Sequence, residues 1–329
     1  MERANKRRRY LKLAVVGLLV LFVVAIALFF LKLWEQQWGR FPVSDPQDEI
    51  FIYDGKEYTP KEGIETFLVL GLDKYEQDGS NLDSYNNDKQ ADFLLLFVFD
   101  NNAKTFSAIH VNRDTMAKVN VLGVAGDKID TVTKQIALAH TYGNGKDVSC
   151  RNTANAVSDL LGVKVNHYLS LTMDSVAVFN DLVGGVEVTV LEDFTGIDET
   201  LVKGSTVTLK GEQALHYVRT RYGLEDSTNS TRMERQQQYL NGFYDKFTES
   251  IENDEEFLAN AAKSISEYIV SDRSVTQMQE LVRKFKEYDY GGIRDLDGES
   301  KMGEKFIEFY PKENSIKKVV SELFYVPKG

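Results

Sequence analysis

The residues of this sequence best suited to chemistry are arginines and carboxylates at the ends of predicted strands and helices. Asp73 ends one apolar run, Asp92 begins a second, and Arg113 follows a third. Arg219 and Arg221 are two residues apart, and this spacing places both side chains on one side of an extended segment. Guanidinium groups bind phosphate through paired hydrogen bonds and are always charged. These residue types therefore indicate a site for a phosphorylated ligand.

A predicted helix start carries a second group of such residues. Arg232, Arg235 and Gln236 are at positions i, i+3 and i+4, which share one helix face. A helix N-terminus also offers free backbone N–H groups to an anion. The carboxylates of Asp73 and Asp92 can hold Mg²⁺ against phosphate oxygens, so the whole pattern is typical of a pyrophosphate site with a divalent cation. The alternative is an ordinary solvated surface, since spacing alone does not show that these side chains converge.

Short apolar runs alternate with helical patterns along the chain, as in an α/β domain with a mixed sheet. A hairpin is predicted before them, because Asp54-Gly55 suits a tight turn. A capping box at Thr231 and Glu234 predicts the start of a long helix that reaches about residue 250. The other predicted elements are the strands Thr66–Asp73, Ala91–Asp100, Phe106–Val111 and Val165–Leu171, and the helices Thr131–His140, Thr153–Leu161 and Ser175–Leu182.

The N-terminus reads as a membrane anchor. Residues 1–12 are basic, and the run Leu13–Leu31 that follows has no charge. These ~19 residues span roughly 28 Å as a helix, close to the thickness of the hydrocarbon layer, so we predict a transmembrane helix at residues 13–33. The basic flank predicts a cytoplasmic N-terminus and a body outside the cell. A cleaved signal peptide is the alternative, because Ala25-Ile26-Ala27 resembles a cleavage site.

Composition excludes several classes of function. The net charge of −11 combines +5 in residues 1–12 with −16 in the remainder, and so acidic a body argues against a nucleic-acid partner. Cys150 is the single cysteine, which rules out an internal disulfide, and we expect a buried thiol. The sequence has no P-loop, GxSxG or HExxH motif. Core or surface roles are expected for the four histidines, which are His110, His140, His167 and His216.

One ordered set of segments resembles a known family. The chain contains, in this order, GLD, ADFLLL, NRDT, DLVGGVEV, LKGEQALHYVRTR and STRMERQQQYL. From about Glu65 to Tyr239, this combination is similar to the LytR–CpsA–Psr (LCP) family of bacterial cell-wall proteins. The resemblance implies a three-layer α-β-α sandwich with a mixed central sheet. It also implies Mg²⁺-dependent transfer of a glycan from a polyprenyl-pyrophosphate carrier to peptidoglycan.

The resemblance assigns roles residue by residue. Asp73 and Asp92 match the carboxylates on the metal side. Lys128, in GDKID, matches a family lysine more loosely. The residues that match the pyrophosphate clamp are Arg113, Arg219, Arg221, Arg232 and Gln236. The chain departs from the family pattern at Gln90, Phe93 and Asn112, which removes one cation and one hydroxyl and bears on the identity of the substrate.

We therefore expect a single-pass cell-membrane protein with a stalk and hairpin at residues 34–64, an LCP-like catalytic domain at 65–250 and a helix-rich C-terminal subdomain at 251–329. The expected function is that of a phosphotransferase that moves a teichoic acid or another wall polysaccharide. Arg113, Arg219 and Arg221 would stabilise developing charge, and Asp92 would be a metal ligand or the base. The alternatives are a non-catalytic polyprenyl-phosphate-binding or regulatory protein and a lipid pyrophosphatase. Apolar residues on adjacent strands would enclose the prenyl chain, namely Phe67, Leu68, Leu70, Leu94, Leu96 and Phe97, unless they form ordinary core.

Overall fold

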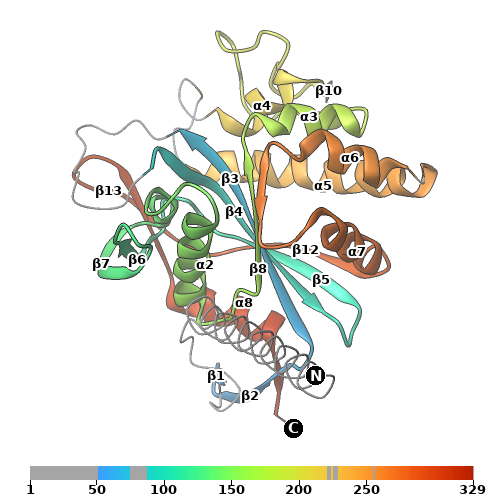
Figure 1. Ribbon diagram of the computed structural model, residues 1–329. Coiled ribbons are helices and arrows are strands. Elements are labelled where there is room, and N and C mark those ends of the chain that lie inside the picture. The colour runs from blue at the N-terminus through green and yellow to red at the C-terminus, as the bar shows by residue number, and fades with distance from the viewer. Residues whose placement is uncertain (1–50, 75–86, 221–223, 225–228, 255, 329) are drawn as a thin grey trace, which may run out of the picture. The chain divides into compact units, whose positions relative to one another are not determined.

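The computed structural model describes residues 51–74, 87–220, 224, 229–254 and 256–328 (Figure 1). The predicted transmembrane helix and Arg221 lie outside these ranges. Within the described ranges, no helix is long and apolar enough to cross a membrane. The described residues belong to one compact unit, which begins at residue 46.

A six-stranded sheet organises this unit, with the strand order β11-β8-β3-β4-β5-β12. Strand β3 runs antiparallel to β4 and parallel to β8, and β5 runs antiparallel to β4 and parallel to β12. The predicted mixed sheet is thus confirmed. Its strands are β3 (Ile64–Lys74), β4 (Lys89–Asp100), β5 (Thr105–His110), β8 (His167–Thr172), β11 (Ile269–Ser271) and β12 (Asp289–Asp295).

Helices pack on both faces of this sheet, which explains why β3 and β4 are apolar in their central parts, at residues 67–72 and 93–99. Helices α2 (Asp147–Leu161) and α8 (Glu313–Phe324) share one apolar core with β3 and β4 (Figure 1). On the opposite face, aromatic side chains of β4 and β5 pack with residues of α5 (Asn229–Asn253) and α7 (Val275–Phe285). The result is three layers, helix on sheet on helix.

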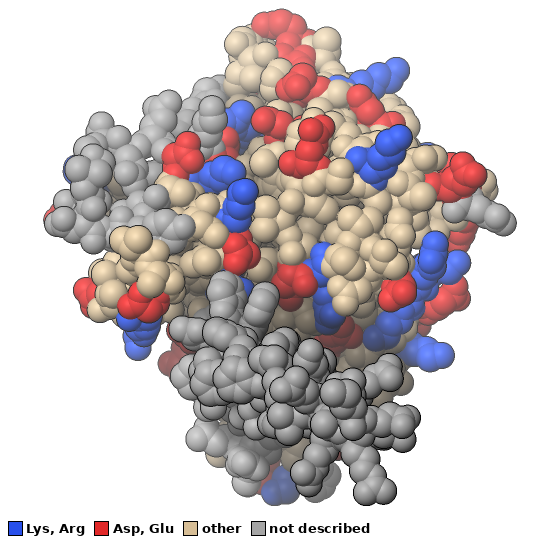
Figure 2. Space-filling view, in the orientation of Figure 1, with Lys and Arg blue, Asp and Glu red and all other residues tan. Residues whose placement is uncertain are grey.

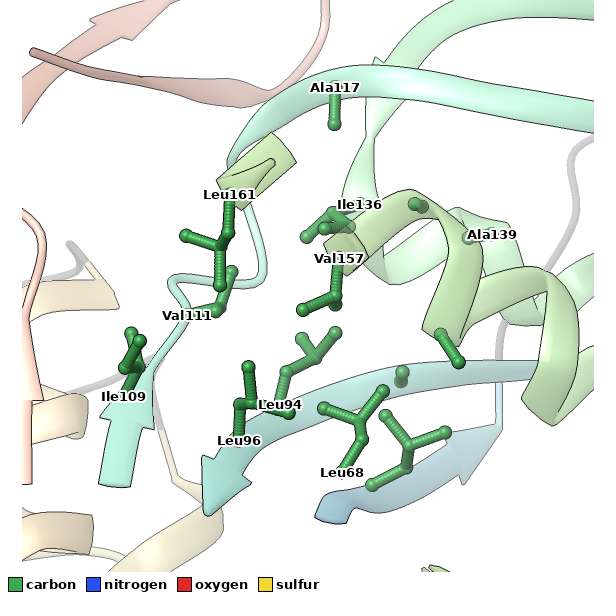
Figure 3. Close-up of a cluster of buried hydrophobic side chains, with 14 of the residues drawn as sticks. Leu68, Leu94, Leu96, Ile109, Val111, Ala117, Ile136, Ala139, Val157 and Leu161 are labelled. Carbon is green, nitrogen blue, oxygen red and sulfur yellow. The ribbon is translucent and has the colours of Figure 1, made fainter. Parts of the chain in front are cut away.

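The core on the α2 side is closed. Leu68, Leu70, Leu94 and Leu96 have no exposed area and pack with residues such as Val157 of α2 (Figure 3). A side chain with no accessible area does not border a space large enough for water. The expectation that these four leucines enclose a prenyl chain is therefore wrong, because strand alternation turns them into the solid core.

The predicted hairpin is confirmed. Strand β1 (Phe51–Tyr53) pairs with β2 (Lys56–Pro60), and the turn residues Asp54 and Gly55 have φ values of 50° and 71°. Two positive φ angles in succession are the mark of a tight primed turn. The C-terminal strand β15 (Tyr325–Pro327) also pairs with β2, so the hairpin is tied to the end of the chain.

Three predictions need correction. The helix predicted at Thr131–His140 is strand β7 (Lys128–Gln135), paired with β6 (Met116–Leu122), and then a 3₁₀ helix. Helix α5 begins at Asn229, two residues before the expected cap. The C-terminal subdomain is not separate, because β11 and β12 from that stretch are the edge strands of the central sheet.

The remaining elements complete the unit. Helix α3 (Ser175–Leu182) has the predicted bounds, and α2 includes the helix predicted at Thr153–Leu161. The others are the 3₁₀ helix η2 (Ile136–Thr141), helices α4 (Glu212–Arg219) and α6 (Phe257–Ile265), the paired strands β9 (Val186–Thr189) and β10 (Thr206–Leu209), and the paired strands β13 (Gly298–Met302) and β14 (Ile307–Pro311).

Two buried histidines should make stability depend on pH. Burial lowers the pKa of His140 to about 4, and burial together with the charge of Arg232 lowers the pKa of His110 to about 3. Both pKa values lie below the unfolded value of about 6.5, so the unfolded chain binds more protons below that pH. The stability due to the neutral imidazoles is complete above pH 6.5 and is lost as the pH falls towards 4.

When the pH is lowered from 6.5 to 5, we expect each buried histidine to reduce the free energy of unfolding by roughly 2 kcal/mol. Urea unfolding of the full chain, followed by circular dichroism at both pH values, measures this loss. His140→Gln should show a pH dependence smaller by about that amount. An unchanged pH dependence in His140→Gln would show that burial does not lower the pKa of this imidazole.

Candidate functional site

Asp92 occupies a β-bulge between β3 and β4. Gly71 pairs with Phe93 and Leu72 pairs with Ala91, so Asp92 is the extra residue on its strand. The two strands approach closely here, since a Cβ on Gly71 would lie 2.9 Å from the Cβ of Phe93. Bulges redirect side chains and are common beside active sites. This bulge gives Asp92 two arginine partners at the end of the sheet.

Arg113 is the first of these partners and follows β5. Its Nη1 donates to Oδ1 of Asp92 at 2.5 Å, and its Nη2 donates to Oε1 of Gln90 at 2.8 Å. Its Nε also lies 3.4 Å from Oδ1 of Asp114. The guanidinium is thus held on three sides. From the sequence, Gln90 is notable only because it stands where the family often has an arginine, and the structure adds that it accepts a hydrogen bond from Arg113.

Arg232 is the second partner of Asp92 and comes from the first turn of α5. Its Nη2 donates to the backbone oxygen of Asp92 at 3.2 Å, and its Nη1 lies 3.6 Å from Oδ2. Asn229, three residues earlier, donates to Oδ1 of Asn112 at 2.9 Å. The start of α5 is therefore fixed against the loop after β5, and Arg113 and Arg232 meet at one carboxylate.

Arg219 forms a separate pair with Asp73 at the end of β3. Its Nε and Nη2 donate to the two carboxylate oxygens of Asp73 at 2.7 and 2.9 Å. Arg219 is the last residue of α4, so the expectation that it lies on an extended segment is wrong. Its side chain remains 47% exposed and is open to a ligand. The predicted partner Arg221 lies outside the described residues.

The other predicted clamp residues lie apart from these pairs. Gln236 is buried and donates its side-chain N–H to the backbone oxygen of Val218 at 3.0 Å, so it contacts α4. Lys128 is exposed at the start of β7. The structure thus brings together three of the predicted cations and both predicted carboxylates.

The donor set fits a divalent cation only together with phosphate. No cluster of three or more His, Cys, Asp or Glu side chains that could hold a metal occurs in the part of the chain that is described. Asp73 and Asp92 lie on adjacent strands, and all four carboxylate oxygens face guanidiniums. Mg²⁺ commonly takes one or two carboxylates and completes its shell with phosphate oxygens and water. Two carboxylates therefore suffice if the arginines turn to the phosphates.

On the face shown in Figure 2, the described charged side chains form no basic patch that could attract a phosphorylated ligand to the site. Lys and Arg side chains are interspersed there with Asp and Glu and do not gather into one basic field. The arginines of the site are instead matched individually to carboxylates within hydrogen-bond distance. Such matched pairs suit a small, highly charged ligand that can replace the carboxylates as the partner of the guanidiniums.

Comparison with known proteins identifies similar chains. The model of the LytR_cpsA_psr family matches residues 45–324. The polyisoprenyl-teichoic acid–peptidoglycan teichoic acid transferase TagT of Bacillus subtilis is 31% identical over 265 residues, which cover 74% of each chain. The transferase TagU of the same organism is 28% identical over 249 residues, 74% of this chain and 72% of its own. A solved structure, TagT bound to LIIa-WTA, has a TM-score of 0.58 at 22% identity and covers 84% of this chain and 95% of its own, which shows a shared fold.

Proposed function

Because the chain belongs to the LytR_cpsA_psr family, we propose that it transfers a glycopolymer from a polyprenyl-pyrophosphate carrier to peptidoglycan. The observation that supports this most is the grouping of Arg113, Arg219 and Arg232, from three separate segments, around two carboxylates at one end of the sheet. Its relatives TagT and TagU are named as teichoic acid transferases, which favours teichoic acid as the glycopolymer.

The proposed reaction is a phosphotransfer. A hydroxyl of a peptidoglycan sugar attacks the phosphorus next to the glycan, the bond to the bridging oxygen breaks, and polyprenyl phosphate leaves. The hydroxyl proton passes to a base, and a phosphodiester joins glycan and peptidoglycan. Arg113 and Arg219 stabilise the charge that develops on the phosphate oxygens, since positioning and electrostatics dominate such reactions. Asp92 fits the role of a holder of guanidiniums better than that of the base, because both of its oxygens face arginines.

Mg²⁺ is proposed at Asp73 and Asp92, where it would neutralise pyrophosphate charge. This proposal predicts a specific effect of Asp73→Asn. Without Asp73, Arg219 has no competing carboxylate, so inorganic pyrophosphate should bind about 2- to 5-fold more tightly in EDTA, as expected for a partly exposed ion pair. The same variant should lose the gain in affinity that Mg²⁺ gives to wild type.

Calorimetric titration of the full chain with pyrophosphate, in EDTA and in Mg²⁺, measures both effects. Asp147→Asn is the matched control, because it removes a carboxylate from another arginine pair on the surface of α2. Weaker binding of pyrophosphate to Asp73→Asn in EDTA would mean that Asp73 does not compete for Arg219.

The prenyl chain is proposed to lie on the sheet face opposite the closed core. Val69, Phe93, Phe97 and Leu169 share this face and remain partly exposed, although they lie on central strands. Large apolar side chains left accessible there suit a lipid tail. A donor with one or two isoprene units should therefore be a poorer substrate than one with a long chain.

The membrane anchor at residues 13–33 is retained as part of the proposal, with the catalytic unit outside the cell. Protease added to intact protoplasts should digest the body of the protein. Complete protection before lysis would contradict this topology.

One assay separates the proposed function from its alternatives. The full chain is incubated with lipid-linked donor and peptidoglycan oligomers, with and without Mg²⁺, and the products are identified by mass spectrometry. Glycan joined to peptidoglycan through a phosphate supports the transferase. Release of glycan phosphate without attachment would indicate a lipid pyrophosphatase, and binding without any product would indicate a regulatory protein.

A further inference from the structure

The most deeply buried ion pair near the site belongs to none of the proposed ligand contacts. Arg235 and Glu192 have side chains only 1% and 4% exposed, with Nε of Arg235 2.8 Å from Oε2 of Glu192. The guanidinium also lies over the rings of Phe194 and Tyr217, at 5.2 and 5.8 Å from their centres. Removing two charges from water is costly, and a well-packed apolar pair is often as stable. A structural role alone therefore explains this pair poorly.

The contacts of Arg235 point to the end of α4. Its Nη1 donates to the backbone oxygen of Tyr217, and its Nη2 donates to that of Thr220. The next residue on α5, Gln236, binds the oxygen of Val218. The last carbonyls of a helix have no partner within the helix. Two adjacent residues of α5 thus satisfy three carbonyls on either side of Arg219.

We propose that the Arg235–Glu192 pair is a latch that positions Arg219 for the pyrophosphate. The two Nη atoms of Arg235 hold the carbonyls at both ends of the Tyr217–Thr220 segment. This fixes the direction in which the side chain of Arg219 extends from the end of α4. Glu192 binds the Nε side of the same guanidinium. Arg235 is a positioning residue, since it acts only through Arg219. The proposal rests on the proposed function, because it gives Arg219 a pyrophosphate ligand.

The test is a double-mutant cycle measured by binding of inorganic pyrophosphate to the full chain. The latch is removed by the paired change Arg235→Met and Glu192→Leu, which leaves no unpaired buried charge. This variant should bind pyrophosphate about tenfold more weakly than wild type. In a protein that already carries Arg219→Ala, the same paired change should weaken binding by less than a further twofold. The pair acts through Arg219, so it has little effect once Arg219 is absent. A purely structural role would give the same loss in both backgrounds.

Thr66→Val is the stability control. Thr66 is buried at the opposite end of β3 and bonds Lys164 and Asn166, so its loss lowers stability without touching α4. It should bind pyrophosphate as wild type does. If the paired change prevents folding, Arg235→Lys replaces it in the double-mutant cycle. Lysine keeps the positive charge beside Glu192 but cannot donate to two carbonyls at once.

The outcomes separate the latch from the function it serves. Wild-type affinity in the latch variant, or an equal loss in both backgrounds, overturns the latch. If Arg219→Ala itself binds pyrophosphate as wild type does, Arg219 is not a pyrophosphate ligand, and the part of the proposed function that gives it this role fails. If Arg219→Ala weakens binding and the latch variant does not, only the latch proposal fails.

Discussion

Arg219→Ala should abolish most transfer while leaving the fold almost unchanged. A charge-assisted contact contributes about 1.5–3 kcal/mol, so its loss should weaken binding of the pyrophosphate donor by roughly 10- to 150-fold. The ion pair of Arg219 with Asp73 is partly exposed, and such pairs add at most about 1 kcal/mol to stability. Transfer kinetics and thermal unfolding of the full chain measure the two effects separately.

The controls for Arg219 test the geometry of its side chain. Arg219→Lys should recover little activity, since a point charge cannot reproduce the two parallel bonds of a guanidinium. Arg294→Ala should leave transfer intact, because Arg294 is a partly exposed arginine on β12 that lies near Glu322. Full activity of Arg219→Ala would remove this residue from the site.

Arg113→Ala should have the larger effect on turnover. Its guanidinium is largely buried between Asp92, Gln90 and Asp114, where it is held in advance for charge on the reacting phosphate. Removal of one such preorganised donor typically slows an enzyme by about 10²–10³-fold. The variant should also lose about 1–3 kcal/mol of stability, because Gln90 loses its partner. Asp92 keeps Arg232, which limits the damage to the fold.

A second arginine distinguishes catalysis from stability in this case. Arg273 lies near the start of β8 and contacts His167. Arg273→Ala should lower stability as well but leave turnover at the wild-type rate. If Arg113→Ala and Arg273→Ala lose turnover in proportion to their loss of unfolding temperature, Arg113 has only a structural role.

The sheet was predictable where the chain is apolar over most of a strand. Strands β3 and β4 have long apolar central runs, β5 is mostly apolar, and α3 has a clear helical period between turn residues. Strand β7 was predicted as a helix because the pattern of its threonines and other residues fits both structures. Only its pairing with β6 shows that it is a strand. The pairing of β12 with β5 joins residues far apart in the chain, which no local pattern reveals.

The site was predictable in its residue types but not in its connections. Asp73, Asp92 and the arginines are predictable from the sequence, and the structure groups Arg113, Arg219 and Arg232 with those carboxylates. The bulge at Asp92 depends on a register shift, and the burial of Arg235 depends on Glu192, 43 residues earlier. Both follow from tertiary packing, so the sequence offered no signal for them beyond the position of Arg235 on the same helix face as Arg232.

The most direct test of this account is a structure of the full chain with a polyprenyl-pyrophosphate donor and Mg²⁺. We expect the pyrophosphate to contact Arg113, Arg219 and Arg232, with the bond between Arg219 and Asp73 broken and the prenyl chain beside Val69 and Phe97. A bound donor whose phosphates lie elsewhere, with the Arg219–Asp73 pair intact, would contradict the central claim that these arginines form the pyrophosphate site.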